Sequence, residues 1–157
     1  MKIHRINFLL LSTAVILSLF SCATSPEKKI DSVYVMVYDF DNNEVMNVSI
    51  FIDGKVVGKT DIYGRLMFPC VKEKLSVIKA EKEGYEKLEN TTVLKAALVL
   101  YFKMGSSNYY ATEAEKLLDE NNLVDALKMI DKALEIQERK DYQYLKDVIL
   151  RRSENEE

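Results

Sequence analysis

The spacing of hydrophobic residues changes once along this chain, near residue 105, and this change constrains the fold more than any other feature. From about residue 32 to 104, apolar residues come in short runs separated by turn residues, which is typical of β-strands. From 107 to 153 they recur at helical spacing. The sequence therefore predicts an α+β protein, with a small antiparallel β-sandwich over residues 31–104 and a helical unit over 107–153.

The β region is expected to hold six or seven short strands. Residues 33–38 are apolar on both faces, so we expect this strand to be buried on both sides. Residues 48–52 alternate and lead into Asp53-Gly54, the strongest short-range signal for a hairpin. Gly84-Tyr85 marks a turn between the last two strands. The return strand and the later strands are expected at 55–60, 66–70, 75–80 and 98–102.

The C-terminal region predicts two helices in a hairpin and a third helix that caps them. The first begins near Ser107 and ends at the break made by Asn121-Asn122. A third amphipathic segment runs from Tyr142 to Arg152, and residues 154–157 form a polar tail. The apolar stripes of the first two helices consist of Ala114, Leu117 and Leu118, and of Ala126, Leu127, Ile130, Ala133 and Leu134.

The N-terminus has the three parts of a signal peptide, over residues 1–21. Lys2 and Arg5 precede an apolar run at 8–20, which is roughly 13 residues long and shorter than the ~20 that a spanning helix needs. Its last residues, Leu19-Phe20-Ser21-Cys22, resemble the lipobox of bacterial lipoproteins. That resemblance implies cleavage before Cys22, lipidation of the Cys22 sulfur and fatty acylation such as palmitate. An uncleaved membrane anchor and ordinary secretory cleavage are the alternatives.

The lipoprotein interpretation also implies an address. The mature chain would begin at Cys22 and continue through a lipidated tether, 22–30, that offers no apolar periodicity. We therefore expect a protein that is anchored to a membrane of the bacterial cell envelope, on the periplasmic side or at the cell surface. The sequence does not specify the inner or the outer membrane, the leaflet or the oligomeric state.

Composition argues against several kinds of chemistry. The one histidine, His4, lies in the signal segment, so a mature chain has no imidazole for a Ser-His-Asp or Cys-His nucleophile or for a histidine zinc site. Without Lys2 and Arg5 the net charge is about −5, with no basic stripe, which argues against binding to nucleic acid. We expect a protein that is not an enzyme and has no cofactor and no metal.

Two polar or reactive motifs receive ordinary structural interpretations. Asp39, Asp41 and Asn43 have the spacing of the start of a calcium loop, but the later Gly and Glu are missing, so a polar hairpin turn is expected. Cys70 would be the only thiol once Cys22 carries lipid. We expect Cys70 to be a small buried apolar residue, with intermolecular pairing or reactivity as the alternative.

The middle of the chain resembles the carboxypeptidase regulatory-like domain and the related PEGA-type domain. The resemblance is carried by residues 45–55, by Gly58-Lys59-Thr60-Asp61-Ile62-Tyr63-Gly64-Arg65-Leu66 and by the segment 77–85 that ends in Gly84-Tyr85. It implies a seven-stranded, transthyretin-like sandwich that acts as an accessory or adhesive module. The motif residues shape turns, because Asp61 can accept hydrogen bonds from the turn backbone and glycine relieves a steric constraint.

The C-terminal region is similar to a single tetratricopeptide repeat followed by a capping helix. One such repeat is below the roughly three needed for independent stability, so it must pack on the sandwich or on a partner. Either the helices cover a face or edge of the sandwich, or they form a protein-binding groove. The residues that carry the similarity are Tyr110, Ala114, Leu117, Leu123, Ala126, Ile130 and Ala133.

The functional prediction is a non-enzymatic envelope lipoprotein that acts as a protein-interaction, adhesive or scaffold module. Its partners would be the membrane, through the lipid, and an envelope protein. The candidate contact residues lie about a turn apart on the polar side of the first helix: Asn108, Thr112, Glu115 and Asp119. One alternative is a lipoprotein that binds glycan or peptidoglycan through the sandwich and exposed tyrosines; another is the accessory subunit of a hydrolase. The tyrosine candidates are the Tyr109-Tyr110 pair and Tyr142 with Tyr144, unless they belong to the core.

Overall fold

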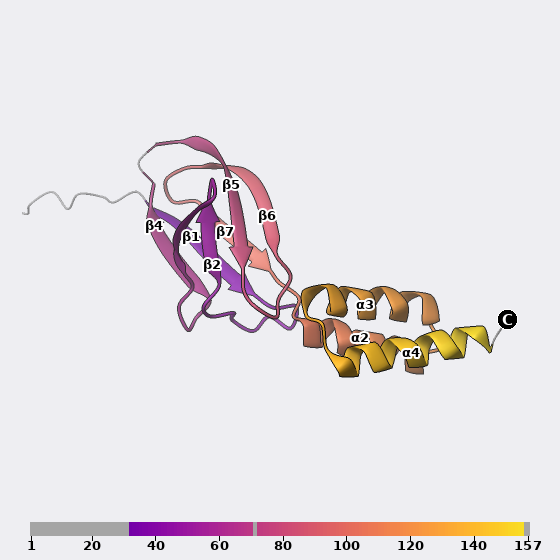
Figure 1. The fold of residues 1–157 in the computed structure, drawn as a ribbon. Coiled ribbons are helices and arrows are strands. Elements are labelled where there is room, and N and C mark those ends of the chain that lie inside the picture. Colours follow the sequence, from indigo (N-terminus) through magenta and orange to yellow (C-terminus); the bar gives the residue numbers. More distant parts are fainter. Residues whose placement is uncertain (1–31, 71, 156–157) are drawn as a thin grey trace, which may run out of the picture. The chain divides into compact units, whose positions relative to one another are not determined.

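The computed structural model describes residues 32–70 and 72–155. Within these ranges, seven strands are followed by three helices (Figure 1). This order confirms the prediction of an α+β chain with a strand-rich part before a helical part. The predicted signal segment, Cys22 and the tether lie outside the described residues, as do the last two residues of the predicted tail.

The strands form two sheets. One has three strands in the order β4-β1-β7, and the other has four in the order β3-β2-β5-β6. Neighbouring strands are antiparallel except β1 and β7, which are parallel, with Tyr34 opposite Val99 and Tyr38 opposite Lys103. The strands are β1 (Ser32–Tyr38), β2 (Ser49–Ile52), β3 (Lys55–Lys59), β4 (Arg65–Pro69), β5 (Lys74–Glu81), β6 (Leu88–Leu94) and β7 (Val99–Lys103).

The parallel pair corrects the prediction of an entirely antiparallel sandwich. Parallel neighbours need a long crossover connection, and here the chain from β2 to β6 supplies it. A pattern of apolar residues shows where strands occur but not which neighbour each strand chooses. The first and last strands of the sandwich therefore meet in an orientation that local sequence does not encode.

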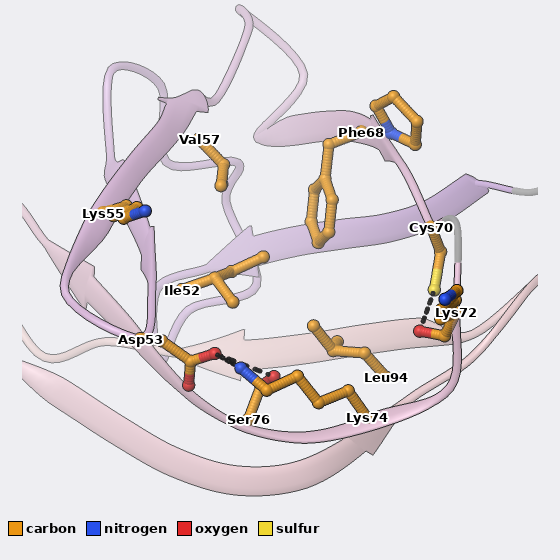
Figure 2. A pocket seen from close by; sticks show the side chains of 11 residues that line it. Ile52, Asp53, Lys55, Val57, Phe68, Cys70, Lys72, Lys74, Ser76 and Leu94 are labelled. Carbon is orange, nitrogen blue, oxygen red and sulfur yellow. Dashed lines mark hydrogen bonds and ion pairs between the residues drawn. The ribbon is translucent and has the colours of Figure 1, made fainter.

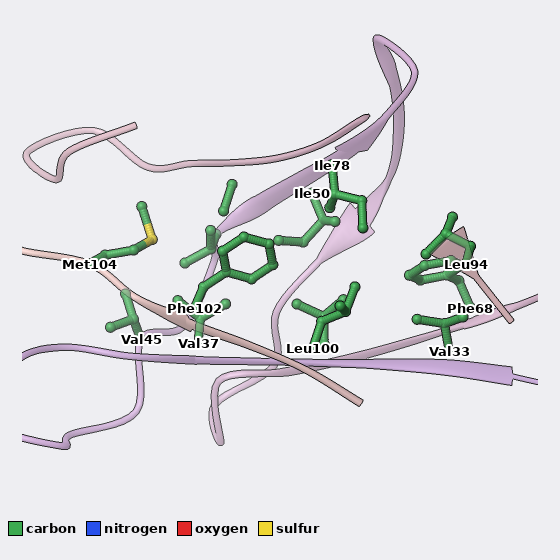
Figure 3. Close-up of a cluster of buried hydrophobic side chains, with 13 residues drawn as sticks. Val33, Val37, Val45, Ile50, Phe68, Ile78, Leu94, Leu100, Phe102 and Met104 are labelled. Atoms are coloured by element: carbon green, nitrogen blue, oxygen red, sulfur yellow. The ribbon is translucent and has the colours of Figure 1, made fainter. Parts of the chain in front are cut away.

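Strand β1 is buried on one face only, which corrects a second prediction. Val33, Val35 and Val37 have no exposed surface, whereas Tyr34, on the other face, is 45% exposed. The valines face the second sheet and pack in the core drawn in Figure 3 with residues such as Ile50 and Ile78. The apolar side chains on the opposite face of β1 therefore belong to the protein surface.

Strand β6 was not predicted from the sequence. It pairs with β5 from Leu88 opposite Ala80 to Leu94 opposite Lys74, at the edge of the four-stranded sheet. Of its residues only Leu94 is buried, and its middle is Glu-Asn-Thr-Thr. An edge strand with so little apolar contact has no hydrophobic alternation to recognise, and polar side chains protect such an edge from pairing with other chains.

The hairpin predicted at Asp53-Gly54 is confirmed. Both residues have positive φ, 49° and 79°, as a type I′ turn requires. The Asp53 carboxylate also accepts hydrogen bonds from the Val77 N–H at 3.0 Å and from Ser76 at 3.2 Å. It pairs with Lys74 at 2.7 Å, and the pKa of Asp53 is held below its usual value first by that contact with Lys74. The turn is thus tied to β5.

The turn between β3 and β4 has the hydrogen bonds and the glycine conformation that its sequence predicts. The Asp61 carboxylate accepts hydrogen bonds from the N–H groups of Tyr63 and Arg65, both at 2.9 Å. Gly64 has φ +68°, and a Cβ there would lie 2.4 Å from the Val37 carbonyl oxygen. Only glycine permits this close approach of the turn to β1.

The loop after β1 forms a polar turn, as expected from its sequence. Asn43 donates its main-chain N–H to Asp39 Oδ1 at 2.8 Å and its side-chain amide to Asp39 Oδ2 at 3.1 Å. Asn42 adopts positive φ, 65°, which asparagine tolerates better than most residues. The Asp39 carboxylate is therefore used within the turn.

The three helices are α2 (Ser107–Asp119), α3 (Leu123–Ile136) and α4 (Lys140–Glu154). Ser106 caps α2 by accepting the Tyr109 N–H, and Asn122 caps α3 after the predicted break. The predicted stripes meet in one buried cluster, with Ala114, Ala126, Ile130, Ala133 and Ile149 fully inaccessible to solvent. Alanines at the crossing points let the helices approach closely.

Candidate functional site

The four predicted contact residues lie on the solvent face of α2. Asn108, Thr112, Glu115 and Asp119 are all exposed, and we call them the polar row. The buried residues of α2, which include Tyr110, Ala111 and Ala114, occupy the other side of the helix. The polar row is thus available at the surface, on a helix whose apolar face is already covered.

Helix α4 packs mainly against α3 and is also joined to α2 near both ends. Asn108 Oδ1 accepts hydrogen bonds from Tyr142 and, at 2.8 Å, from Arg139, which also pairs with Asp141 at 2.6 Å. At the other end, Arg152 donates to the Leu118 carbonyl at 3.3 Å. Asn108 is therefore committed to an internal contact.

The other three members of the polar row differ from Asn108. Thr112, Glu115 and Asp119 make no side-chain hydrogen bond or ion pair with any residue that the structure describes. Their polar atoms face solvent and can exchange water for an external partner. The part of the polar row that is free to bind thus consists of Thr112, Glu115 and Asp119, toward the C-terminal end of α2.

The helices do not cover a sheet face, which was one of the two predicted arrangements. Their buried residues form one hydrophobic cluster and those of the sandwich form another. The contacts between the two parts join loops of the sandwich to residues of the helical unit, such as the β-bridge between Tyr85 and Ser106 and the ring contact between Phe40 and Tyr109 of α2, whose centroids are 5.0 Å apart. The three helices thus share a core of their own and are held at the sandwich by its loops.

A cluster of polar groups fixes this contact, and we call it the junction cluster: Glu86, Gly105, Tyr110 and Lys132. Glu86 Oε1 accepts the Gly105 N–H at 2.7 Å and the Tyr110 hydroxyl at 3.0 Å, while Oε2 pairs with Lys132 at 2.9 Å. The Lys132 ammonium lies 4.3 Å from the centroid of the Tyr110 ring. One carboxylate thus joins the loop after β5, the start of the helical unit and α3.

Burial and hydrogen bonding oppose each other at Glu86. The side chain is 15% exposed, and burial by itself would raise the pKa of its carboxyl. Donors on Lys132, Gly105 and Tyr110 outweigh that effect, so the pKa of Glu86 lies below its ordinary value. The carboxylate is therefore charged when the junction cluster is formed.

Two predicted tyrosine pairs do not form exposed platforms. Tyr110 and Tyr142 are each only 4% exposed, because Tyr110 belongs to the junction cluster and Tyr142 to the helical core. A Cβ on Gly105 would lie 2.4 Å from the Tyr110 ring, so that ring packs directly on the main chain of the glycine. Tyr109 is half-buried against Phe40, and Tyr144 alone of these four is freely exposed, at 71%.

Sequence reasoning missed an apolar surface on the three-stranded sheet. Tyr34, Met67, Val99 and Tyr101 are exposed on its outer face, which we call the tyrosine face. Together with Met36 and Arg65 they line a shallow depression of about 530 Å³. The sequence does contain a signal for this surface, because the second face of residues 33–38 is also apolar. The prediction that this strand is buried on both sides hides that signal.

A second pocket, of about 390 Å³, opens at one end of the sandwich (Figure 2). Its walls are apolar and include Ile52, Val57, Phe68 and Leu94, and its rim carries the lysines Lys55, Lys72 and Lys74. Cys70 lies in this pocket and is partly buried rather than fully buried as predicted. Its thiol contacts the Lys72 carbonyl oxygen at 3.6 Å.

Two further properties concern the described residues as a whole. None of their His, Cys, Asp and Glu side chains gather in groups of three or more that could hold a metal ion. None of the helices in 32–155 combines the length and the apolar character needed to cross a bilayer.

No protein-family model and no curated protein matches the chain. Solved structures that are similar in part include the Bacillus anthracis TIE protein, with 13% identity and a TM-score of 0.41, and the shaft pilin spaA from Lactobacillus rhamnosus GG, with 17% identity and a TM-score of 0.37. Each match covers 48% of this chain. The chain spans 16% of the length of the first of these proteins and 47% of the second.

Proposed function

We propose that this chain is a non-enzymatic, lipid-anchored module of the bacterial cell envelope whose helical unit binds another envelope protein. The observation that carries this proposal is the free part of the polar row. One exposed face of α2 carries Thr112, Glu115 and Asp119. The opposite, hydrophobic face of the same helix is already packed in the core. A partner can therefore bind there without any rearrangement of the helical core.

The junction cluster supports this role. A contact surface on a loosely attached helical hairpin would lose conformational freedom on binding, which weakens affinity. Here the Glu86 carboxylate links the sandwich to α2 and α3 through Tyr110 and Lys132. The sandwich then serves as a firm support for the helices.

For the sandwich we propose a transthyretin-like spacer or adhesive unit, in keeping with its resemblance to the carboxypeptidase regulatory-like domain. What supports this is the turn at 60–64. The buried Thr60 hydroxyl accepts the Val48 N–H at 2.9 Å and donates to the Val45 carbonyl at 2.8 Å, and Asp61 and Gly64 complete the turn. The side chains of Thr60 and Asp61 thus stabilise the turn.

The membrane attachment in this proposal rests on the Leu19-Phe20-Ser21-Cys22 sequence. Acyl chains on Cys22 would hold the protein on a bilayer, since each buried CH₂ contributes about 0.8 kcal/mol and two or more chains make the attachment stable.

Affinity capture from envelope extract tests the proposed contact surface. Glu115→Lys with Asp119→Lys reverses two exposed charges of the polar row, and we expect folding to be kept but recovery of the specific partner to fall at least about tenfold. The matched control is Asp41→Lys with Glu83→Lys, which changes the same charge on exposed sandwich loops. Equal recovery by both variants would refute the polar row as the binding surface.

The tyrosine face favours a second candidate function, the binding of glycan or peptidoglycan. Tyr34 and Tyr101, 45% and 69% exposed, flank an apolar depression where a sugar ring could stack. Sedimentation with isolated cell wall tests this. If Tyr34→Ala with Tyr101→Ala removes cell-wall binding while the polar-row variant retains it, the glycan function takes precedence.

A further inference from the structure

The chain that precedes the sandwich enters it at the end where the lysine-rimmed pocket opens. Ser32, the first residue of β1, lies opposite Pro69, and its carbonyl accepts the Ala97 N–H at 2.9 Å. Pro69 and Leu94, which precedes the loop of Ala97, line the pocket drawn in Figure 2. We call this the tether end; it comprises residues 53–55, 70, 72–74 and 95–98.

The tether end is basic, although the chain as a whole is acidic. It carries Lys55, Lys72, Lys74 and Lys95 against Asp53 and Glu73, and Asp53 is paired with Lys74. The other three lysines form no ion pair with the described residues. At the opposite end, the loops 39–44 and 81–87, the turn 61–65 and the strand ends Lys59 and Lys103 together carry seven acidic and five basic residues. The fold therefore separates charge along the sandwich.

Apolar side chains are exposed beside these lysines. Leu75 is 64% exposed and lies opposite Val93, which is 47% exposed, on neighbouring strands next to Lys74. Val56, adjacent to Lys55, is 62% exposed. Lysines interleaved with exposed aliphatic residues suit the boundary between lipid headgroups and acyl chains, where a lysine stem contacts apolar groups and its ammonium reaches phosphate.

We propose that the tether end docks on the anionic headgroups of the bilayer that holds the acyl anchor, with Lys55, Lys72, Lys74 and Lys95 contacting lipid phosphates. This inference rests on the proposed lipid anchor at Cys22. Cys22 to Asp31 can span at most about 35 Å, so the anchor keeps the lysines close to the membrane surface. The short tether gives the lysines a high effective concentration at the membrane surface. Contacts that are individually weak are then enough to hold the docked state.

Docking would also orient the helical unit. Strand β7 is parallel to β1, so it ends at Lys103 on the side of the sandwich away from the tether end, and α2 begins shortly afterwards at Ser107. With the tether end on the bilayer, the polar row is carried on the membrane-distal side. The lysines would therefore fix which way the proposed contact surface faces.

Cys70 offers a native reporter for the test, because it is the only thiol of the mature chain once Cys22 is acylated. Mature lipidated protein is reconstituted in vesicles of phosphatidylcholine alone or with added phosphatidylglycerol, and alkylation of Cys70 by a membrane-impermeant maleimide is timed. We expect alkylation to be about fivefold slower or more on the anionic vesicles, and high salt to remove the difference.

Two charge-matched variants assign the effect. The tether-end variant replaces Lys55, Lys72, Lys74 and Lys95 by Gln and should alkylate at the same rate on both kinds of vesicle. The control variant replaces four exposed lysines elsewhere, Lys59, Lys87, Lys103 and Lys140, by Gln and should keep the difference. A rate difference of equal size in both variants overturns the proposal, because it would reflect only the general field of the surface.

The wild-type protein also decides the question without any variant, since equal alkylation rates on neutral and anionic vesicles overturn docking. Sedimentation with the neutral vesicles reports the anchor separately. Protein that sediments with both kinds of vesicle but shows no protection of Cys70 has the anchor without the docking. Protein that fails to sediment with neutral vesicles refutes the lipid anchor and the docking that rests on it.

Discussion

Loss of the Glu86 carboxylate should weaken the connection between the sandwich and the helices. This carboxylate accepts hydrogen bonds from the Gly105 N–H at 2.7 Å and the Tyr110 hydroxyl at 3.0 Å, and it pairs with Lys132 at 2.9 Å. Hydrogen bonds to a charged group contribute about 1.5–3 kcal/mol each and are not additive. We therefore expect Glu86→Ala to lower the free energy of unfolding by about 3–4 kcal/mol and Glu86→Gln, which keeps one acceptor, by about 1–2 kcal/mol.

Urea denaturation followed by circular dichroism measures these changes. Glu89→Gln is the matched control, because Glu89 also pairs with a lysine, Lys79, at 2.7 Å but is 55% exposed. An exposed pair contributes at most about 1 kcal/mol, and often nothing measurable. Because the two hydrophobic clusters are separate, loss of the junction cluster should also split one unfolding transition into two. Equal small losses in the Glu86→Gln and Glu89→Gln variants would refute the reasoning.

The junction cluster should also respond to acid. The pKa of Glu86 in the folded protein lies below the ordinary glutamate value of 4.5, so its contribution is complete above that value. It should be lost as the pH falls from about 4.5 through the lowered pKa, because the unfolded chain then binds the proton more readily. Hydrogen exchange of the Gly105 amide can be measured with decreasing pH and corrected for intrinsic rates. Its protection should fall in this pH window in the wild-type protein but not in the Glu86→Gln variant.

Four further substitutions probe the turns, the helical core and the anchor. Gly54→Val should lower the free energy of unfolding by about 1–3 kcal/mol from strain at positive φ, whereas Gly64→Ala should cost more because its Cβ meets a main-chain carbonyl. Thermal melts that match wild type would contradict both. Ala126→Arg should unfold the helical unit by overpacking a fully buried position, unlike Val124→Arg at a position 67% exposed, as circular dichroism can show. Cys22→Ala should abolish incorporation of labelled palmitate, and undiminished labelling would rule out the lipoprotein assignment.

The elements that the sequence predicted correctly are those with local physical causes. The hairpin at Asp53-Gly54 depends on two adjacent residues that tolerate positive φ, and the helices depend on apolar spacing within each segment. Strand β6 could not be predicted because an edge strand with one buried residue has no such spacing. The parallel pairing of β1 with β7 could not be predicted for another reason, because the choice of neighbour depends on the whole sheet.

The candidate sites divide in the same way. Exposure of the polar row follows from helical geometry, so its four residues could be placed on one face in advance. The junction cluster could not be found this way, because Glu86 follows an ordinary Gly-Tyr turn and its partner Lys132 lies on a distant amphipathic helix. From the sequence, each of the two residues is predicted to be a surface charge, and only the fold brings them together.

The lysines of the tether end show how a fold can concentrate charge that a sequence disperses. Lys55 begins β3 after a hairpin turn, Lys74 begins β5 with Lys72 shortly before it, and Lys95 follows β6, so the four lysines are dispersed along the chain and form no basic stripe. Strands of similar length bring every second connection to the same end of a sandwich. The positive charges of the lysines in those connections therefore gather at one end of the sandwich. The negative charges of the acidic loops gather at the other end. A membrane that attracts the basic end repels the acidic end, so the same separation of charge favours one orientation on the bilayer over its reverse.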